Sequence, residues 1–190
     1  MGAGDDDAAT AAQQLKLMAA HYVRRHPAPR EPGTIRSTGG PTFPPLPIDP
    51  GIVDHMRASV TEVAAYVESN VPDASPAPAD DRVYAWMRAN TRQLDPRRQL
   101  TGEAIVFRQR LEHALAMGET EVVHRFLKRQ SCPDCGCWAS LVWQNPVTRA
   151  VCINRRCVNQ DGRAHSYELG FLAHRHIRAR AKTAAARHAT

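Results

Sequence analysis

Apolar residues recur every three or four positions in the first part of the chain, which is the spacing of a helix that buries one face. In residues 8–26 the recurring residues are Ala11, Leu15, Met18 and Tyr22. A second helix is predicted over residues 50–69, because Asp49 suits the N-cap and Pro50 the first helical position. Its stripe consists of Val53, Met56, Val60, Val63 and Val67. We expect the first stripe to contact another part of the chain or a partner protein.

Three shorter helices are predicted before residue 130. Asp80 or Asp81 caps the first of these three helices, and Pro96 prevents that helix from continuing. Thr101 caps the second, and Gly118 suits its end because glycine tolerates positive φ. The third is short and forms a hairpin with the second. The apolar positions of these helices are Val83, Tyr84, Met87, Ala104, Phe107, Leu111, Ala114, Leu115, Val122, Val123, Phe126 and Leu127.

Two proline-rich segments interrupt the helical pattern. Residues 27–50 hold eight of the 14 prolines, and residues 72–80 hold three more. Proline fixes φ and lacks an amide proton, so both segments are predicted to be linkers. The first could also be a polyproline ligand for a partner's aromatic groove. A stiff, extended spacer is the interpretation we favour.

All five cysteines lie between residues 132 and 157. Cys132 and Cys135 are two residues apart, Cys152 and Cys157 four apart, and 16 residues separate the pairs. Four thiolates can surround a zinc ion as a tetrahedron, with Zn–S distances of about 2.3 Å. A two-residue spacer lets one tight turn present two sulfurs, and Gly136 suits the positive φ that often follows. The sequence therefore predicts these four cysteines as metal ligands.

The segment between the cysteine pairs is predicted to be a β-hairpin. Residues 138–144 lead out, Asn145 and Pro146 form the turn, and residues 147–152 return. Residues 165–170 favour a third strand, and residues 171–189 a terminal helix. Four thiolates would fill the coordination shell, so the zinc is expected to be structural rather than catalytic.

Several alternatives remain at this site. Cys137 could replace Cys135 as a ligand, stay a free thiol, act as a redox switch, or pack as a small buried apolar residue, which is the interpretation we favour. His165 is an alternative ligand. An iron–sulfur cluster is the competing cofactor, and a colourless protein with one zinc ion would exclude it.

Two cysteine turns that clamp a short antiparallel sheet resemble the zinc-ribbon fold group, here over about residues 132–170. The Cys132–Cys135 turn with Gly136 carries the resemblance, whereas the Cys152–Cys157 spacing of four departs from the usual two. The helical body that leads into Cys-Pro-x-Cys-Gly is similar in general style to uncharacterised helical zinc-ribbon proteins of actinobacteria and their phages. That resemblance implies no known activity.

Composition restricts the class of protein. Apolar residues make up 43% of the chain, which is enough for a core. The chain has no run of 18 apolar residues, so no membrane span is expected. Its start is acidic and does not resemble a signal peptide. We therefore expect a cytoplasmic protein whose thiols stay reduced.

Positive charge is concentrated in the half that carries the cysteines. Residues 101–190 hold 14 basic and 7 acidic side chains, whereas residues 1–100 hold 11 and 12. The candidate nucleic-acid contacts are Arg149, Arg155, Arg156, Arg175, Arg178 and Lys182. The last three share one face of the terminal helix. The alternative is a solvated tail in an arginine-rich proteome, and Trp138 or Trp143 could stack on bases or pack the hairpin.

We therefore expect a mainly α fold with five parts. An N-terminal helix (1–26), a proline-rich linker (27–50), a helical domain (51–130), a zinc ribbon with short antiparallel strands (131–170) and a basic C-terminal helix (171–190) follow one another. No glycine-rich phosphate loop, Gly-x-Ser-x-Gly motif or suitably placed carboxylate pair is present, so no enzyme is expected. The predicted function is a nucleic-acid-binding or transcription-associated adaptor. The alternative is a protein–protein interaction module that uses its N-terminal helices, such as a phage or mobile-element accessory protein or a virion component.

Overall fold

The structure is a computed structural model that describes residues 3–25, 50–144 and 149–188. These residues form six helices and one three-stranded antiparallel sheet, which confirms a mainly α fold with a small sheet and a C-terminal helix. The predicted linker over residues 27–50, apart from Pro50, and the predicted turn at Asn145 and Pro146 lie outside the described residues. No helix in the described part is long and apolar enough to cross a membrane.

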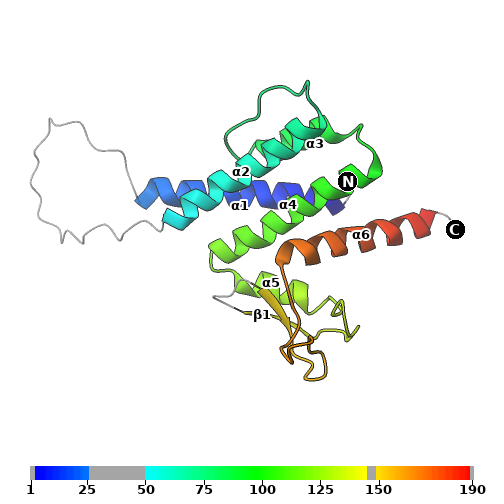
Figure 1. Cartoon of the computed structure of the whole chain (residues 1–190). Helices are drawn as coiled ribbons and strands as arrows, with labels where there is room; N and C mark the ends of the chain where they lie inside the picture. The colour runs from blue at the N-terminus through cyan, green and yellow to red at the C-terminus, as the bar shows by residue number, and fades with distance from the viewer. Residues whose placement is uncertain (1–2, 26–49, 145–148, 189–190) are drawn as a thin grey trace, which may run out of the picture.

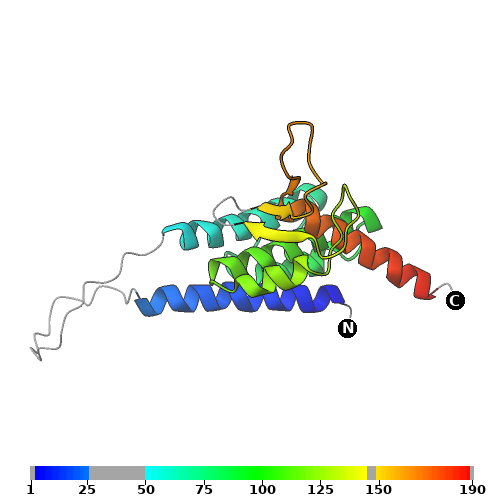
Figure 2. The ribbon, with the colours of Figure 1, turned by 90° about the horizontal axis from the view of Figure 1, so that it is seen from below.

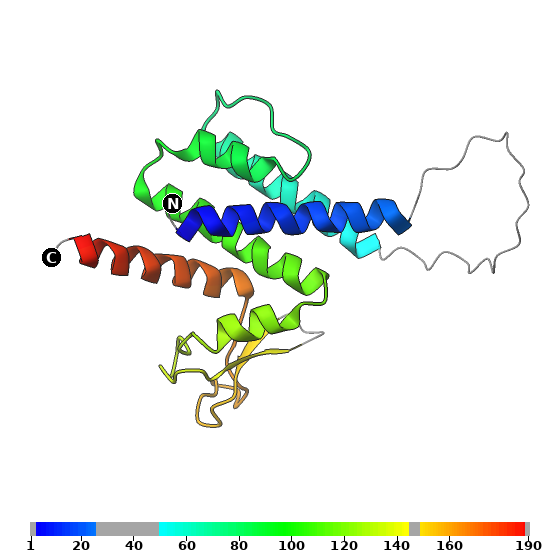
Figure 3. The same ribbon diagram turned by 180° about the vertical axis from the view of Figure 1, so that it is seen from behind.

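Helix α4 (Pro96–Ala116) is the centre of the molecule. Helix α1 (Ala3–Arg25) crosses one side of it together with α2 (Pro50–Asn70) and α3 (Val83–Thr91), as Figure 3 shows. Helix α6 (Leu169–His188) packs beside α4 on the other side, and α5 (Thr120–Leu127) and the sheet lie below (Figure 1). Two apolar core clusters result, one on each side of α4.

The predicted apolar stripes of α1 and α2 pack inside the protein. Ala11, Leu15 and Met18 are buried, while the side chain of Tyr22 lies outside the described residues. Val63 and Val67 of α2 are fully buried in the same cluster. The stripe of α1 therefore makes a tertiary contact, which is one of the two outcomes expected for it.

The predicted cap of α4 at Thr101 was wrong, because the helix begins at Pro96 and its N-cap lies six residues earlier. Asp95 is the N-cap, and its Oδ1 accepts hydrogen bonds from the backbone N–H of Arg97 at 3.0 Å and of Arg98 at 3.2 Å. Pro96 fits at the first helical position, where a missing N–H costs no hydrogen bond. The predicted end was correct, since Gly118 has a φ of +82° directly after the C-cap.

The sheet consists of β1 (Leu141–Gln144), β2 (Arg149–Cys152) and β3 (Ser166–Tyr167) in the order β1-β2-β3. Leu141 lies opposite Cys152, so the hairpin places this cysteine against the core side of the sheet. The third strand is shorter than the predicted 165–170. Leu169 already begins α6, because its apolar residues bury against α4: Leu169, Leu172, Ala173 and Ile177.

A chain of hydrogen bonds runs through the helical core. His113 is completely buried on α4. Its Nδ1 lies 2.8 Å from His55 Nε2, and its Nε2 lies 2.8 Å from the hydroxyl of Tyr84. Tyr84 donates in turn to Gln109 Oε1 at 2.8 Å. These partners satisfy polar groups that burial would otherwise penalise.

Candidate metal centre

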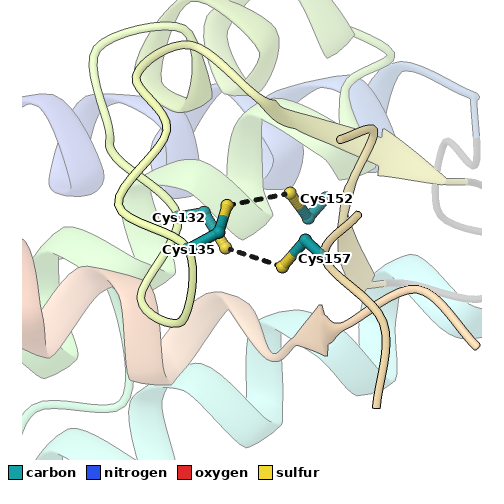
Figure 4. A group of neighbouring side chains, drawn as sticks. All are labelled: Cys132, Cys135, Cys152 and Cys157. Atoms are coloured by element: carbon teal, nitrogen blue, oxygen red, sulfur yellow. Dashed lines mark hydrogen bonds between the residues drawn. The ribbon is translucent and has the colours of Figure 1, made fainter. Parts of the chain in front are cut away.

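Four cysteine sulfurs converge at one end of the sheet. The Sγ atoms of Cys132, Cys135, Cys152 and Cys157 all lie within 4.8 Å of one another and could hold a metal ion. Figure 4 shows two of them on the loop after α5, facing one at the end of β2 and one on the loop that follows. The sulfurs are 3.7 Å apart between Cys132 and Cys157, and 3.8 Å apart between Cys135 and Cys152. A tetrahedron with metal–sulfur bonds of about 2.3 Å has edges of about 3.8 Å, so these two separations fit.

The first cysteine turn is tight and closed by backbone hydrogen bonds. Gly136 N–H donates to the carbonyl of Cys132 at 3.0 Å, and Cys132 N–H donates to the carbonyl of Cys137 at 2.9 Å. Gly136 has a φ of +70°, as its place after the turn predicted. The backbone N–H of Cys137 also donates to the sulfur of Cys135.

The second cysteine turn accommodates its longer spacing through Asn154. The side-chain Oδ1 of Asn154 accepts from Arg156 N–H at 3.1 Å, and its carbonyl accepts from Cys157 N–H at 2.8 Å. The backbone N–H of Asn154 donates to Cys152. This contact matches that of Cys137 with Cys135 in the first turn. The two extra residues, Arg155 and Arg156, form the exposed tip of the turn.

The sulfurs differ in their electrostatic surroundings. Burial raises the pKa of Cys157 far above the usual value for a thiol, and burial also raises the pKa of Cys152. Cys135 is the most exposed of the four, and the N–H of Cys137 lowers its pKa to about 6. Buried sulfurs packed together resist ionisation unless a cation balances their charge. The site therefore has the electrostatic character of a cation site.

Three side chains surround the sulfurs without entering the metal set. The hydroxyl of Tyr167 lies 3.0 Å from the Sγ of Cys132 and donates to Oδ2 of Asp134. His165 Nδ1 lies 3.0 Å from the same carboxylate oxygen. His165, the alternative ligand, therefore contacts Asp134, and the four-cysteine group does not include it.

Cys137 was expected to be a small buried residue, and this was wrong. It is exposed, and Asn154 Nδ2 donates to its sulfur at 3.2 Å. The reason is geometric, because the first turn directs the sulfurs of Cys132 and Cys135 toward those of Cys152 and Cys157 and leaves Cys137 outside this group. This contact places the turn of Cys137 and Trp138 beside the turn that carries Arg155.

The six basic residues chosen from the sequence do not form one group. Arg155, Arg156, Arg178 and Lys182 are exposed. Arg149 is partly exposed, 3.9 Å from Glu168. Arg175 is half-buried, and its guanidinium donates to the carbonyl of Ser131 at 2.8 Å. Of the two tryptophans, Trp138 is 69% exposed, whereas Trp143 is partly buried against the core.

Sequence reasoning missed Tyr167, Asp134 and Asn154 as parts of this site. Asp134 lies inside the first cysteine turn, and its place in Cys-Pro-Asp-Cys was the one available signal. Tyr167 reaches the site from β3, which pairs with β2 from a distant part of the chain. No protein-family model, curated protein or solved structure matches this chain.

Proposed function

We propose that Cys132, Cys135, Cys152 and Cys157 hold one structural zinc ion in a module of the zinc-ribbon kind. The tetrahedral spacing of the sulfurs and their thiolate chemistry support zinc. Four ligands leave no position for a reacting water, so this ion would stabilise the fold rather than act as a Lewis acid. The sheet is small, and metal binding of this type provides about 10–16 kcal/mol at neutral pH.

Metal analysis tests this part of the proposal. The purified chain is expected to be colourless and to contain one zinc per molecule, because an iron–sulfur cluster would colour it brown. Zinc below about half an equivalent after expression in zinc-supplemented medium, or stoichiometric iron, would contradict the assignment. A reducing cytoplasmic compartment belongs to the same proposal, since all five described cysteines are free thiols.

We further propose that the zinc module binds single-stranded nucleic acid. The observation that carries this is the pairing of a cationic tip, Arg155 and Arg156, with an exposed indole, Trp138, on adjacent turns. Arginine contacts phosphate, and an exposed indole stacks on bases of any sequence. Figure 2 shows the loop after the second cysteine turn projecting from the helices on the side away from α1, where a strand can approach.

The other basic residues add less support to the proposal of nucleic-acid binding. Arg149 could provide a third phosphate contact, while Arg178 and Lys182 are an outlying exposed pair on α6.

The protein-interaction alternative was motivated by apolar stripes on the N-terminal helices. Ala11, Leu15 and Val63 of those stripes are buried within the chain, so they offer a partner little apolar surface.

Fluorescence titration with a labelled oligothymidylate tests this function. Three phosphate contacts predict a slope of about −2 in a plot of log K against log salt. Trp138→Ala is expected to weaken binding by about tenfold, because stacking on one base contributes about 1–3 kcal/mol. R155Q/R156Q removes two charges and should flatten the slope.

The matched control is R92Q/R97Q, which removes the same charge from exposed positions near the α3–α4 connection. This variant should bind almost as well as wild type. No binding at low salt, or equal losses in both double variants, would contradict the proposed function.

A further inference from the structure

A second cationic site lies on the helical body. A pocket of about 300 Å³ opens between α4, α5 and α6, and Asp7 of α1 also lines it. Figure 1 shows both α5 and α6 on the side of α4 that faces away from α2 and α3. Its volume lies at the lower end of the range for ligand pockets, about 300–1,000 Å³. We call it the arginine pocket, because four arginines line it: Arg110, Arg125, Arg129 and Arg180.

Two of these arginines are held in place by a buried carboxylate. The side chain of Asp7 is only 6% exposed, and it accepts from Arg110 at 2.5 Å and from Arg180 at 2.7 Å. The side chains of Arg110 and Arg180 remain about 30% exposed. Their positions are therefore fixed before a ligand arrives, which reduces the entropy lost on binding.

The other two arginines have no anionic partner among the described residues. Arg125 lies in the last turn of α5 and Arg129 lies four residues later, so both reach the same side of the pocket. Both are exposed, and neither makes an ion pair within the described part of the chain. The described lining thus contains four guanidinium groups and one carboxylate, an excess of three positive charges.

The floor of the pocket is apolar and aromatic. The ring centroid of Phe107 lies 4.9 Å from that of His176 and 5.2 Å from that of Phe126. Such a floor lowers the local dielectric and strengthens charge interactions above it. Gln130 Nε2 donates to His176 Nδ1 at 3.2 Å, so a neutral His176 carries its proton on Nε2 and can donate from there.

We propose that the arginine pocket binds a phosphate group, carried either by a free nucleotide or by a nucleic-acid backbone. A guanidinium presents its donors as a flat fork that matches phosphate oxygens. A carboxylate has one charge and two oxygens, and Asp7 already shows that such a group balances only part of this cluster. The terminal phosphate of a nucleotide has three free oxygens and a charge of about −1.5 to −2. Each backbone phosphate of a nucleic acid has one negative charge, and neighbouring phosphates add to it. Either source can therefore accept from arginines on both α5 and α6.

Isothermal titration calorimetry on the full zinc-loaded chain at low salt tests the proposal with three probes. The probes are inorganic phosphate, adenosine monophosphate and a short oligothymidylate. Saturable binding of at least one probe is expected, and R125Q/R129Q should weaken it at least tenfold, because hydrogen bonds to charged groups contribute about 1.5–3 kcal/mol each. R92Q/R97Q removes the same charge from exposed positions outside the pocket and should change the affinity by less than about threefold.

The probes also distinguish the source of the phosphate. Binding of the two small probes without the oligonucleotide indicates a free nucleotide, whereas displacement of the small probes by the oligonucleotide indicates a nucleic-acid backbone. The site is independent of the proposed zinc-module surface, so R155Q/R156Q should leave phosphate binding intact even where it abolishes oligonucleotide binding. Absence of binding by all three probes, or unchanged affinity in R125Q/R129Q, overturns the proposal.

Discussion

Asp7 accepts a hydrogen bond from Arg180 at 2.7 Å, although the two residues are 173 positions apart. The contact joins the first helix to the last across α4, and Arg110 of α4 binds the second carboxylate oxygen. The acidic start of the chain and its basic end therefore meet at one buried carboxylate. α1 is consequently fixed to the body through Asp7 as well as through its apolar stripe.

Asp7→Ala is expected to lower the free energy of unfolding by about 2–4 kcal/mol. Breaking a buried ion pair typically costs about 3–5 kcal/mol, and solvent around the two arginines reduces this figure. Urea unfolding followed by circular dichroism measures the change. Asp6→Ala, at an exposed neighbouring position, should stay within about 0.5 kcal/mol of wild type. Equal stabilities of the two variants would show that the Asp7 contacts contribute nothing.

Cysteine substitutions are expected to distinguish the metal ligands from Cys137. Cys132→Ser should prevent stoichiometric zinc binding, because loss of one thiolate removes much of an interaction worth about 10–16 kcal/mol. Cys137→Ser should retain one zinc per chain, since its exposed sulfur lies outside the group of four. A colorimetric chelator assay after gel filtration reports the zinc content. If Cys137→Ser lost zinc while Cys135→Ser kept it, Cys137 would be the ligand.

His113 is expected to make the helical body sensitive to acid. Burial lowers its pKa to about 3, whereas a histidine in the unfolded chain titrates near 6.5. Between these values the unfolded chain binds one more proton, so stability falls as the pH falls below 6.5. The loss should be about 1.4 kcal/mol per pH unit from this residue alone.

Two measurements check the assignment to His113. The NMR shifts of its imidazole should remain those of a neutral ring at pH 5.5. The pH dependence of urea unfolding should flatten in His113→Gln and persist in His21→Gln. A charged His113 ring in the folded protein at pH 5.5 would contradict the prediction.

Arg175→Ala is expected to destabilise the protein, whereas Arg178→Ala is not. The guanidinium of Arg175 donates to the carbonyl of Ser131 at 2.8 Å and to its hydroxyl at 3.1 Å, which ties α6 to the first cysteine turn. Losing these bonds should cost about 1–2 kcal/mol, while exposed Arg178 should change stability by less than about 0.5 kcal/mol. Thermal unfolding of both variants in parallel gives the comparison. Similar melting temperatures of the two variants would contradict a structural role for Arg175.

Helices, turns and the hairpin could be predicted from the sequence, because each depends on residues that are neighbours along the chain. The helical period located α2 and the stripe of α1, and Gly118 located the end of α4 because positive φ is a local requirement. The cysteine pairs and the strand-forming residues between them were enough to predict the group of four sulfurs and the hairpin. Tight turns and hairpins depend on residues that lie close together in the sequence, so local sequence patterns can predict them.

The burial of the polar side chains depends on tertiary packing. His113 is buried because Tyr84 and His55, on two other helices, supply its hydrogen-bond partners. Arg175 and Arg178 are three residues apart and look equivalent in the sequence, yet only Arg175 reaches Ser131. A polar group can be buried only where packing brings it a partner, and those partners are 29 to 58 positions away along the chain here. No local pattern records that choice, which is why the arginine pocket emerged only from the folded chain.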